Sequence, residues 1–141
     1  MQSTTWFLVL STFAILFALG ARGEEGKGGG EERVFELRTY YAAPGKLDDL
    51  HARFRDHTNK LFTKHGMTMI GYWTPVEGTG TPNTLVYILA FPSKEARQKS
   101  WDDFKADPEW VAARNASEVN GKLVDKVVSV FLKPTDYSPM K

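Results

Sequence analysis

Three polar side chains of types that take part in binding and catalysis occupy every second position of one short segment, namely Glu36, Arg38 and Tyr40. The segment 34–41 is rich in β-branched and aromatic residues, which predicts a strand with all three side chains on one face. Two interpretations remain open. Glu36 and Arg38 form an ion pair, within the chain or across a dimer, or Arg38 and Tyr40 form the polar end of an apolar pocket. In that pocket Arg38 is the fixed cation, and Tyr40 donates or accepts a hydrogen bond.

Three further residues are weaker candidates for the same pocket. Trp73 and Tyr87 lie in apolar segments and supply enough bulk to wall a cavity or to fill a core. His65 lies on the apolar stripe of a predicted helix beside Gly66. A histidine there either bonds to the last carbonyls of the helix or faces the pocket.

Several other chemistries are disfavoured by the sequence. His51 and His57 lie about 240° apart around a helix, and about 12 Å of helical rise separates His57 from His65, so these histidines cannot share a metal ion. The chain has no cysteine. It also lacks a Gly-x-Ser-x-Gly elbow and a phosphate-binding loop. We therefore expect no metal and no cofactor, and the catalytic residues, if any exist, are unknown.

Two halves of the chain repeat one pattern. Residues 34–54 and 84–104 both run strand, turn, helix, and an offset of 50 aligns Leu37 with Tyr87. This offset predicts two β-α-β units, and it makes Val86, Ile88 and Ala90 the counterparts of the polar residues in the first strand. The units give the order β-α-β-β-α-β.

Turn and cap signals define the predicted elements. A helix begins near Leu47 and ends at Gly66, Ser93 caps a second helix, and Asp107-Pro108 starts a new helical segment that ends near residue 121. The predicted strands are 34–41, 67–76, 84–91 and 124–133. Right-handed crossovers then give an α+β, ferredoxin-like domain, in which a four-stranded antiparallel sheet carries its helices on one face.

The helix-free face of this sheet is expected to be apolar. Strands 84–91 and 124–133 carry apolar residues at both odd and even positions, whereas a solvent-facing antiparallel strand alternates apolar with polar residues. A large exposed apolar face usually marks an interface. The sequence therefore predicts a homodimer through the helix-free face.

The N-terminus has the pattern of an export signal. Residues 6–19 are largely apolar and are followed by small residues, which predicts a signal peptide at 1–23, cleaved between Ala21 and Glu24. Residues 24–32 form a flexible linker rich in Gly and Glu, and residues 33–141 form one domain. We expect a secreted or periplasmic protein without a stable membrane span after cleavage. An uncleaved signal anchor is the alternative.

The charge balance argues against nucleic acid as a partner. The chain contains 18 Lys and Arg and 17 Asp and Glu. Removal of the predicted signal peptide takes away Arg22, so the remaining protein is neutral. Nucleic-acid affinity needs clustered cations that displace counterions.

The chain resembles the NIPSNAP family. The resemblance rests on Glu-Leu-Arg-Thr-Tyr at 36–40, Asp-Pro-Glu-Trp at 107–110 and Tyr-Ser-Pro at 137–139. It implies a dimeric α/β barrel built from ferredoxin-like domains, related to small cofactor-free monooxygenases and haem-degrading enzymes of the same fold. It implies no agreed catalytic residues. Animal members are mitochondrial, whereas this chain carries the pattern of an export signal.

Two functions remain open. The first is a small-molecule-binding or interaction module, with an apolar small molecule as its ligand, and no established catalysis. The alternative is a cofactor-independent, monooxygenase-like enzyme that acts on an apolar aromatic substrate. The neutral charge and the lack of a nucleophile motif favour the first, and an aromatic pocket with a single Arg or His favours the second.

Overall fold

A computed structural model describes residues 33–141, so the predicted signal peptide and linker lie outside the described residues. The elements are, in order, β1 (Val34–Ala42), α1 (Leu47–Arg53), the π-helical turn η1 (Phe54–Thr58), α2 (Asn59–Lys64), β2 (Thr68–Trp73), β3 (Thr84–Phe91), α3 (Lys94–Ala106), α4 (Pro108–Ser117) and β4 (Val124–Leu132). Within this range no helix is both long and apolar enough to cross a membrane.

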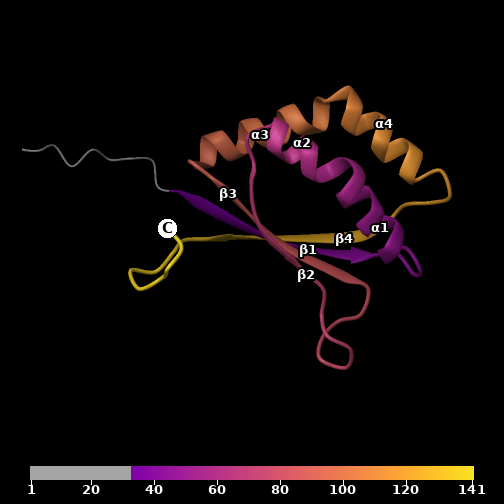
Figure 1. Cartoon of the computed structure of the whole chain (residues 1–141), viewed down its shortest axis with the longest axis horizontal. Helices are drawn as coiled ribbons and strands as arrows, with labels where there is room; N and C mark the ends of the chain where they lie inside the picture. The colour runs from indigo at the N-terminus through magenta and orange to yellow at the C-terminus, as the bar shows by residue number, and fades with distance from the viewer. Residues whose placement is uncertain (1–32) are drawn as a thin grey trace, which may run out of the picture.

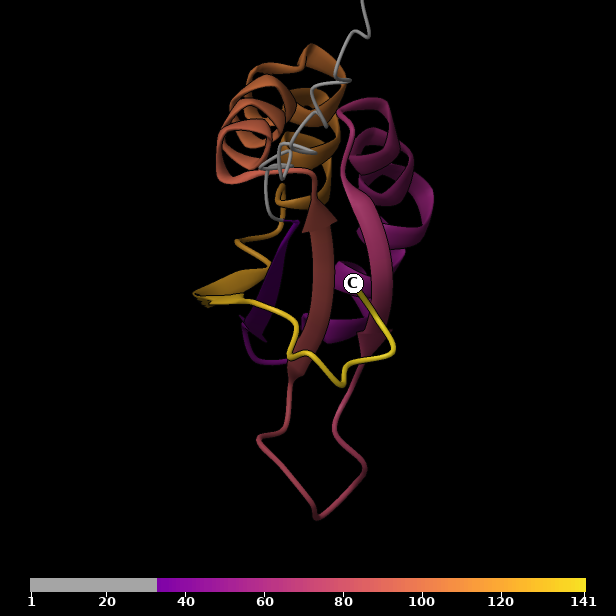
Figure 2. The ribbon, with the colours of Figure 1, turned by 90° about the vertical axis from the view of Figure 1, so that its left-hand side faces the viewer.

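The four strands form one antiparallel sheet in the order β2-β3-β1-β4. All helices lie in one layer on the same side of the sheet, as the two perpendicular views show (Figure 1 and Figure 2). Each β-α-β unit contributes one central strand and one edge strand. The predicted ferredoxin-like α+β fold is confirmed.

The predicted cap signals act where the sequence places them. Gly66 has a φ of +74°, a left-handed conformation that ends the first helical run without a steric penalty. The Ser93 side chain accepts a hydrogen bond from the N–H of Ala96 at the start of α3. Asp107 accepts from the N–H of Glu109, and Pro108 occupies the first turn of α4. The cap at Asp107 and Pro108 splits the second helical region into α3 and α4.

The first helical run contains a π turn. η1 follows directly after Arg53, and the Thr58 hydroxyl donates to the Arg53 carbonyl oxygen, 3.2 Å away. A π turn shifts the helix surface by one residue, so that Thr58 is buried while His57 is exposed. The same turn follows the one buried arginine of α1, whose side chain points toward α4.

Aromatic side chains fill the core between the sheet and the helices. Tyr87 is fully buried, and its ring centroid lies 5.3 Å from those of Tyr40 and Phe54 and 5.5 Å from that of Tyr72. Phe62 packs edge-on against Trp101 at 5.5 Å. These edge and offset contacts are the preferred aromatic geometries. They join both β-α-β units into one core.

The offset of 50 matches the polar residues of β1 with Val86, Ile88 and Ala90 of β3. In the structure these two sets of side chains lie on opposite faces of the sheet, so the predicted counterparts were wrong. Arg38 pairs with Tyr87, and Glu36 pairs with Leu89, so the polar residues of β1 share a face with Tyr87. This is the face that the helices cover, since Trp101 of α3 contacts Glu36. Side chains alternate with a period of two, so a shift of one residue moves a whole strand pattern to the other face.

The helix-free face is apolar, as the strand pattern predicts. Leu37 of β1 lies between Ile88 of β3 and Val130 of β4, and Val130 is 45% exposed. The C-terminal segment lies along one end of this face, where Phe35, Ile88 and residues 132–135 line an apolar groove. An exposed apolar surface of this kind is typical of an interface.

Candidate functional site

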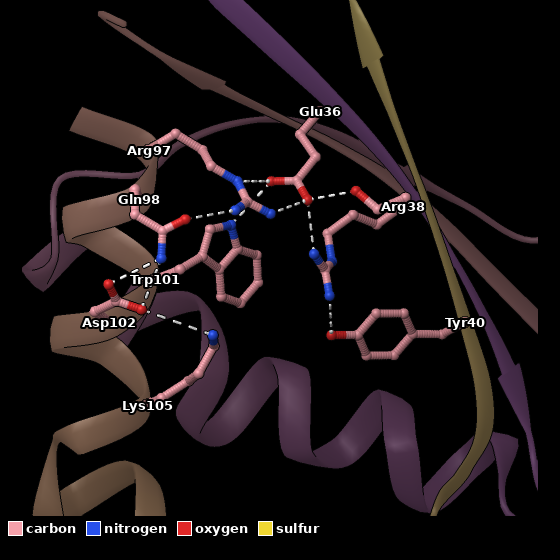
Figure 3. A network of polar contacts seen from close by, with 9 residues as sticks. Glu36, Arg38, Tyr40, Arg97, Gln98, Trp101, Asp102 and Lys105 are labelled. Carbon is pink, nitrogen blue, oxygen red and sulfur yellow. Dashed lines mark hydrogen bonds and ion pairs between the residues drawn. The ribbon is translucent and has the colours of Figure 1, made fainter. Parts of the chain in front are cut away.

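A buried carboxylate organises the polar side chains on the helix-covered face (Figure 3). Glu36 of β1 is fully buried and accepts hydrogen bonds from side chains of three elements. Arg97 of α3 donates through two nitrogens at 2.9 and 2.7 Å, and the Trp101 indole N–H donates at 2.9 Å. Arg38 donates from β1 at 2.7 Å, and the Ser129 hydroxyl donates from β4 at 2.5 Å. Glu36 therefore ties β1, α3 and β4 together.

These donors keep Glu36 ionised. Burial by itself raises the pKa of a carboxyl group because it removes solvent from the charged form. The hydrogen bonds from Arg97, Ser129 and Trp101 and the charge of Arg38 outweigh this effect and lower the pKa of Glu36 to about 2. The group is thus a fixed anion and a weak base near neutral pH.

Arg38 lies between Glu36 and the aromatic side chains of the site. Its guanidinium carbon is 4.2 Å from the Trp101 ring centroid, and Nη2 donates to the Tyr40 hydroxyl at 3.5 Å (Figure 3). Burial lowers the pKa of Arg38, but Tyr40, Tyr87 and Glu36 raise it overall. The side chain is 13% exposed, and its Nε is buried without a hydrogen-bond partner. Arg38 is therefore a permanent cation with an unused donor.

A cleft opens beside Arg38, between the helices and the start of β4. Its volume is about 460 Å³, within the usual range for small-molecule sites. The lining is aromatic and cationic, with four aromatic rings, seven basic side chains and two carboxylates. The rings belong to Tyr40, Trp101, Phe104 and Trp110, the basic side chains are Arg38, Arg53, Arg97, Lys105, Arg114, Lys122 and Lys126, and the carboxylates are Glu118 and Asp125.

Arg53 reaches the cleft from α1, which packs against α4. Its side chain is only 4% exposed, and it donates to Glu118 at 2.9 Å and to the Ser117 hydroxyl at 3.3 Å. Its guanidinium carbon lies 5.3 Å from the ring centroid of Trp110. Burial raises the pKa of Glu118, but the hydrogen bond and charge of Arg53 lower it overall. Arg53 therefore links the first helical run to α4 at the cleft.

The structure brings three of the five sequence-predicted pocket residues together. Arg38 and Tyr40 line the cleft. Tyr87 lies below them in the core, and its hydroxyl oxygen is buried without a hydrogen-bond partner. Burial and the neighbouring Tyr40 raise the pKa of Tyr87, so its hydroxyl stays protonated. Tyr87 supports the cleft from beneath and does not line it.

Trp73 lies on the other side of the sheet, contrary to its predicted place beside Arg38. It pairs with Val86 of β3, whose side chain alternates away from the helix-covered face. The indole is 50% exposed and lines the groove of the helix-free face together with Phe35 and Ile88. The sequence does not show the irregularity between Met69 and Gly71 in the pairing of β2, which sets this orientation.

His65 also lies away from the cleft. Its Nε2 is 2.7 Å from Oδ2 of Asp107, the residue that caps α4. The contact of Nε2 is therefore with a carboxylate and not with a helix-terminal carbonyl. Hydrogen bonds from Lys64 and His65 lower the pKa of Asp107, and together with the N–H of Glu109 they outweigh its burial. His65 joins the end of the first helical run to the start of α4.

The residues that the sequence analysis missed come from the helices. Trp101 was expected to pack against the sheet, and it does, but its indole N–H also bonds to Glu36. Arg97 lies one helical turn before Trp101, and this spacing places both side chains on the face that meets β1. Arg53 and Trp110 have no such local signal, because their contact joins two separate helices. Only the packing of the helices brings them together.

The sheet order and the single helical layer define a ferredoxin-like α+β domain with a cationic, aromatic cleft. A family model described as NIPSNAP matches residues 35–139 of the chain. The chain therefore belongs to the NIPSNAP family, as its sequence motifs indicate. A comparison with curated protein sequences gives no match.

Solved structures share this fold. An uncharacterised NIPSNAP domain protein from Burkholderia xenovorans is 27% identical with a TM-score of 0.64, covering 75% of this chain and 98% of that protein. A NIPSNAP family protein from Agrobacterium tumefaciens is 21% identical with a TM-score of 0.68, covering 78% and 100%. SnoaB, a cofactor-independent oxygenase from Streptomyces nogalater, is 14% identical with a TM-score of 0.52, covering 77% and 98%.

Proposed function

We propose that this chain is a small-molecule-binding protein whose ligand occupies the cleft beside Arg38. The observation that carries the proposal is the combination of a cleft of about 460 Å³ with four aromatic rings in its lining. Ligand sites are typically concave and apolar, with a few polar groups that orient the ligand. Here Tyr40, Trp101 and Trp110 supply apolar surface, and Arg38 supplies a fixed charge. The ligand is therefore an apolar molecule with at least one flat ring.

Native mass spectrometry of protein purified from its own host tests this proposal. We expect a co-purifying small molecule with the wild type and its loss with Arg38→Met. Arg38→Met leaves Glu36 with Arg97, Trp101 and Ser129 as donors, so the variant is expected to fold. Arg55→Met is the matched control, because Arg55 is exposed and does not line this cleft.

Loss of the small molecule from both variants would point to a general loss of structure. Retention of the small molecule by a folded Arg38→Met variant would remove Arg38 from the site. If no small molecule accompanies the wild type, and none from a set of ring-containing compounds binds, the binding proposal is wrong.

A second candidate is a cofactor-independent oxygenase acting on an apolar aromatic substrate. SnoaB, which shares the fold, is a cofactor-independent oxygenase. Without a cofactor the substrate itself must pass electrons to O₂, and a phenol-like substrate does so most readily after losing a proton. The carboxylates bonded to Arg38 and Arg53 are weak bases, since Glu36 and Glu118 both have lowered pKa values. The lowered pKa values favour binding without catalysis.

Oxygen uptake with a dihydroxynaphthalene separates the two candidates. Binding alone predicts the same rate with and without protein. A rate that exceeds the protein-free rate, and that falls to it in Arg38→Met, would establish the oxygenase. The measurement is made at several pH values, because autoxidation without protein also rises with pH.

We further propose that a second copy of the chain covers the helix-free face. Leu37, Ile88 and Val130 lie side by side there, with no helix above them. Burial of such a surface stabilises an assembly by roughly 25 cal/mol per Å² of apolar area. A homodimer with this arrangement leaves the cleft open, because the cleft lies on the helix side of the sheet.

Export remains a proposal from the sequence. Residues 6–19 form the apolar stretch, and small residues follow it before Glu24. The intact mass of the protein from its host tests cleavage. A product that begins between Ala21 and Glu24 supports an exported protein, and a product that retains residues 1–19 indicates an uncleaved anchor.

A further inference from the structure

The cleft carries more positive charge than the chain as a whole. The full sequence has 18 basic and 17 acidic residues, whereas the cleft lining has seven basic side chains and two carboxylates. Two more carboxylates reach these cations from outside the lining, Glu36 at Arg38 and Asp102 at Lys105. Cations still exceed anions after both are counted. A concave site with apolar walls strengthens the resulting field.

The arginines of the cleft share their carboxylates in pairs. Arg38 and Arg97 both donate to Glu36, each with one bond of 2.7 Å to the same oxygen. Arg53 and Arg114 also share one carboxylate, since they contact the two different oxygens of Glu118 at 2.9 and 3.3 Å. Each pair therefore has one negative charge for two positive charges.

Arg38 and Arg53 are the buried members of these pairs. Their side chains are 13% and 4% exposed, and the Nε–H of each is buried without a hydrogen-bond partner. A buried donor without a partner is costly, and a buried cation that shares its counter-ion is costly as well. A further anion in the cleft reduces the second of these costs.

Aromatic rings lie directly against both guanidinium groups. The guanidinium carbon of Arg38 is 4.2 Å from the ring centroid of Trp101, and that of Arg53 is 5.3 Å from the ring centroid of Trp110. Both rings also line the cleft. A ligand that contacts these rings with an apolar body therefore lies beside the two cations.

We infer that the ligand of the cleft is an organic carboxylate with a flat apolar body, and that Arg38 and Arg53 supply the charge that selects it. The inference rests on the proposed function and adds the chemical class of the ligand. Guanidinium groups match a planar carboxylate better than ammonium groups do, because their N–H donors lie in one plane. The more exposed lysines of the lining, Lys105 and Lys122, attract the anion at longer range.

The test compares two probes of nearly equal shape, 2-naphthoate and the neutral 2-naphthalenemethanol. Calorimetric titration of the full chain at pH 7 gives the affinity of each. The acid forms a charge-assisted hydrogen bond where the alcohol forms a neutral one. We therefore expect the acid to bind at least about tenfold more tightly than the alcohol. We also expect the preference for the acid to shrink at high salt, because salt screens the exposed part of the field.

Three results would overturn the inference, and they differ in whether they also remove the proposed function. If the acid and the alcohol bind equally, the cleft is an apolar site without charge selection, and the binding proposal stands. If neither probe binds, the inference fails together with the proposed function. A preference for the alcohol also contradicts the inference.

Substitutions then test which residues cause the preference for the acid over the alcohol. Arg38→Met and Arg53→Met are each expected to reduce the preference for the acid by about tenfold while the alcohol still binds. Arg55→Met is the control, since Arg55 lies on the same helical run but outside this cleft. Circular dichroism checks folding, and Arg53→Lys replaces Arg53→Met if the latter does not fold. An unchanged preference in folded variants of both arginines would contradict the assignment.

Discussion

The buried carboxylate of Glu36 offers the sharpest test of the structural reasoning. The change is Glu36→Gln, which keeps the shape of the side chain and removes its charge. In the wild type the carboxylate accepts from Arg38, Arg97, Trp101 and Ser129. The amide has one acceptor oxygen and cannot serve all these donors. Two arginines then lose their shared counter-ion.

The expected cost follows from the ionisation of Glu36. Its pKa falls from 4.5 to about 2 on folding, a difference of about 2.5 units. At 1.36 kcal/mol per unit the ionised group stabilises the fold by about 3 kcal/mol at pH 7. Removal of one partner from a buried ion pair costs a similar amount, about 3 to 5 kcal/mol. We therefore expect Glu36→Gln to lower the free energy of unfolding by about 3 kcal/mol.

The pH dependence identifies the charge as the cause. A lowered pKa in the folded state means that the stabilisation is fully present above pH 4.5 and is lost as the pH falls toward 2. The difference between wild type and Glu36→Gln should therefore be about 3 kcal/mol at pH 7 and shrink steadily below pH 5. Urea denaturation at a series of pH values measures it.

Glu77→Gln is the matched control, because Glu77 is exposed in the loop between β2 and β3. We expect it to change stability by less than about 0.5 kcal/mol. Equal stability of Glu36→Gln and wild type at pH 7 would refute the assigned role of the network. A difference that does not change between pH 7 and pH 3 would show that shape, and not charge, accounts for the cost.

Three further predictions concern the rest of the fold. Tyr72→Phe should leave stability unchanged or raise it, because the buried hydroxyl of Tyr72 has no hydrogen-bond partner; a loss above about 1 kcal/mol in urea denaturation contradicts this. Gly66→Ala should cost about 1 to 2 kcal/mol by the same measurement, because Gly66 has a φ of +74°, and an unchanged midpoint is the contrary result. Light scattering should give twice the monomer mass, and Val130→Glu should give a folded monomer while the control Val119→Glu stays dimeric. A wild-type monomer at micromolar concentration would overturn the dimer.

Local signals in the sequence determined the elements of the fold and their order. Gly66, Ser93 and Asp107 act on their nearest neighbours along the chain, so their effect on helix ends is visible without tertiary information. The β-α-β repeat and the handedness of its crossovers then restrict the topology to one arrangement. The polar residues on β1 were also recognisable as candidate site residues that share one strand face, since Arg38 and Tyr40 stand two residues apart on a strand.

The tertiary structure decided which face these residues occupy and what surrounds them. The repeat alignment matches Arg38 with Ile88, whereas strand pairing places it opposite Tyr87. A shift of one residue along a strand is enough to move its side chains to the other face of the sheet. Strand pairing places Tyr87 beneath the cleft and Trp73 on the opposite side. Arg53 meets Trp110 only because two helices that are far apart in sequence pack together. Contacts of this kind depend on the packing of the whole core, and no local pattern encodes them.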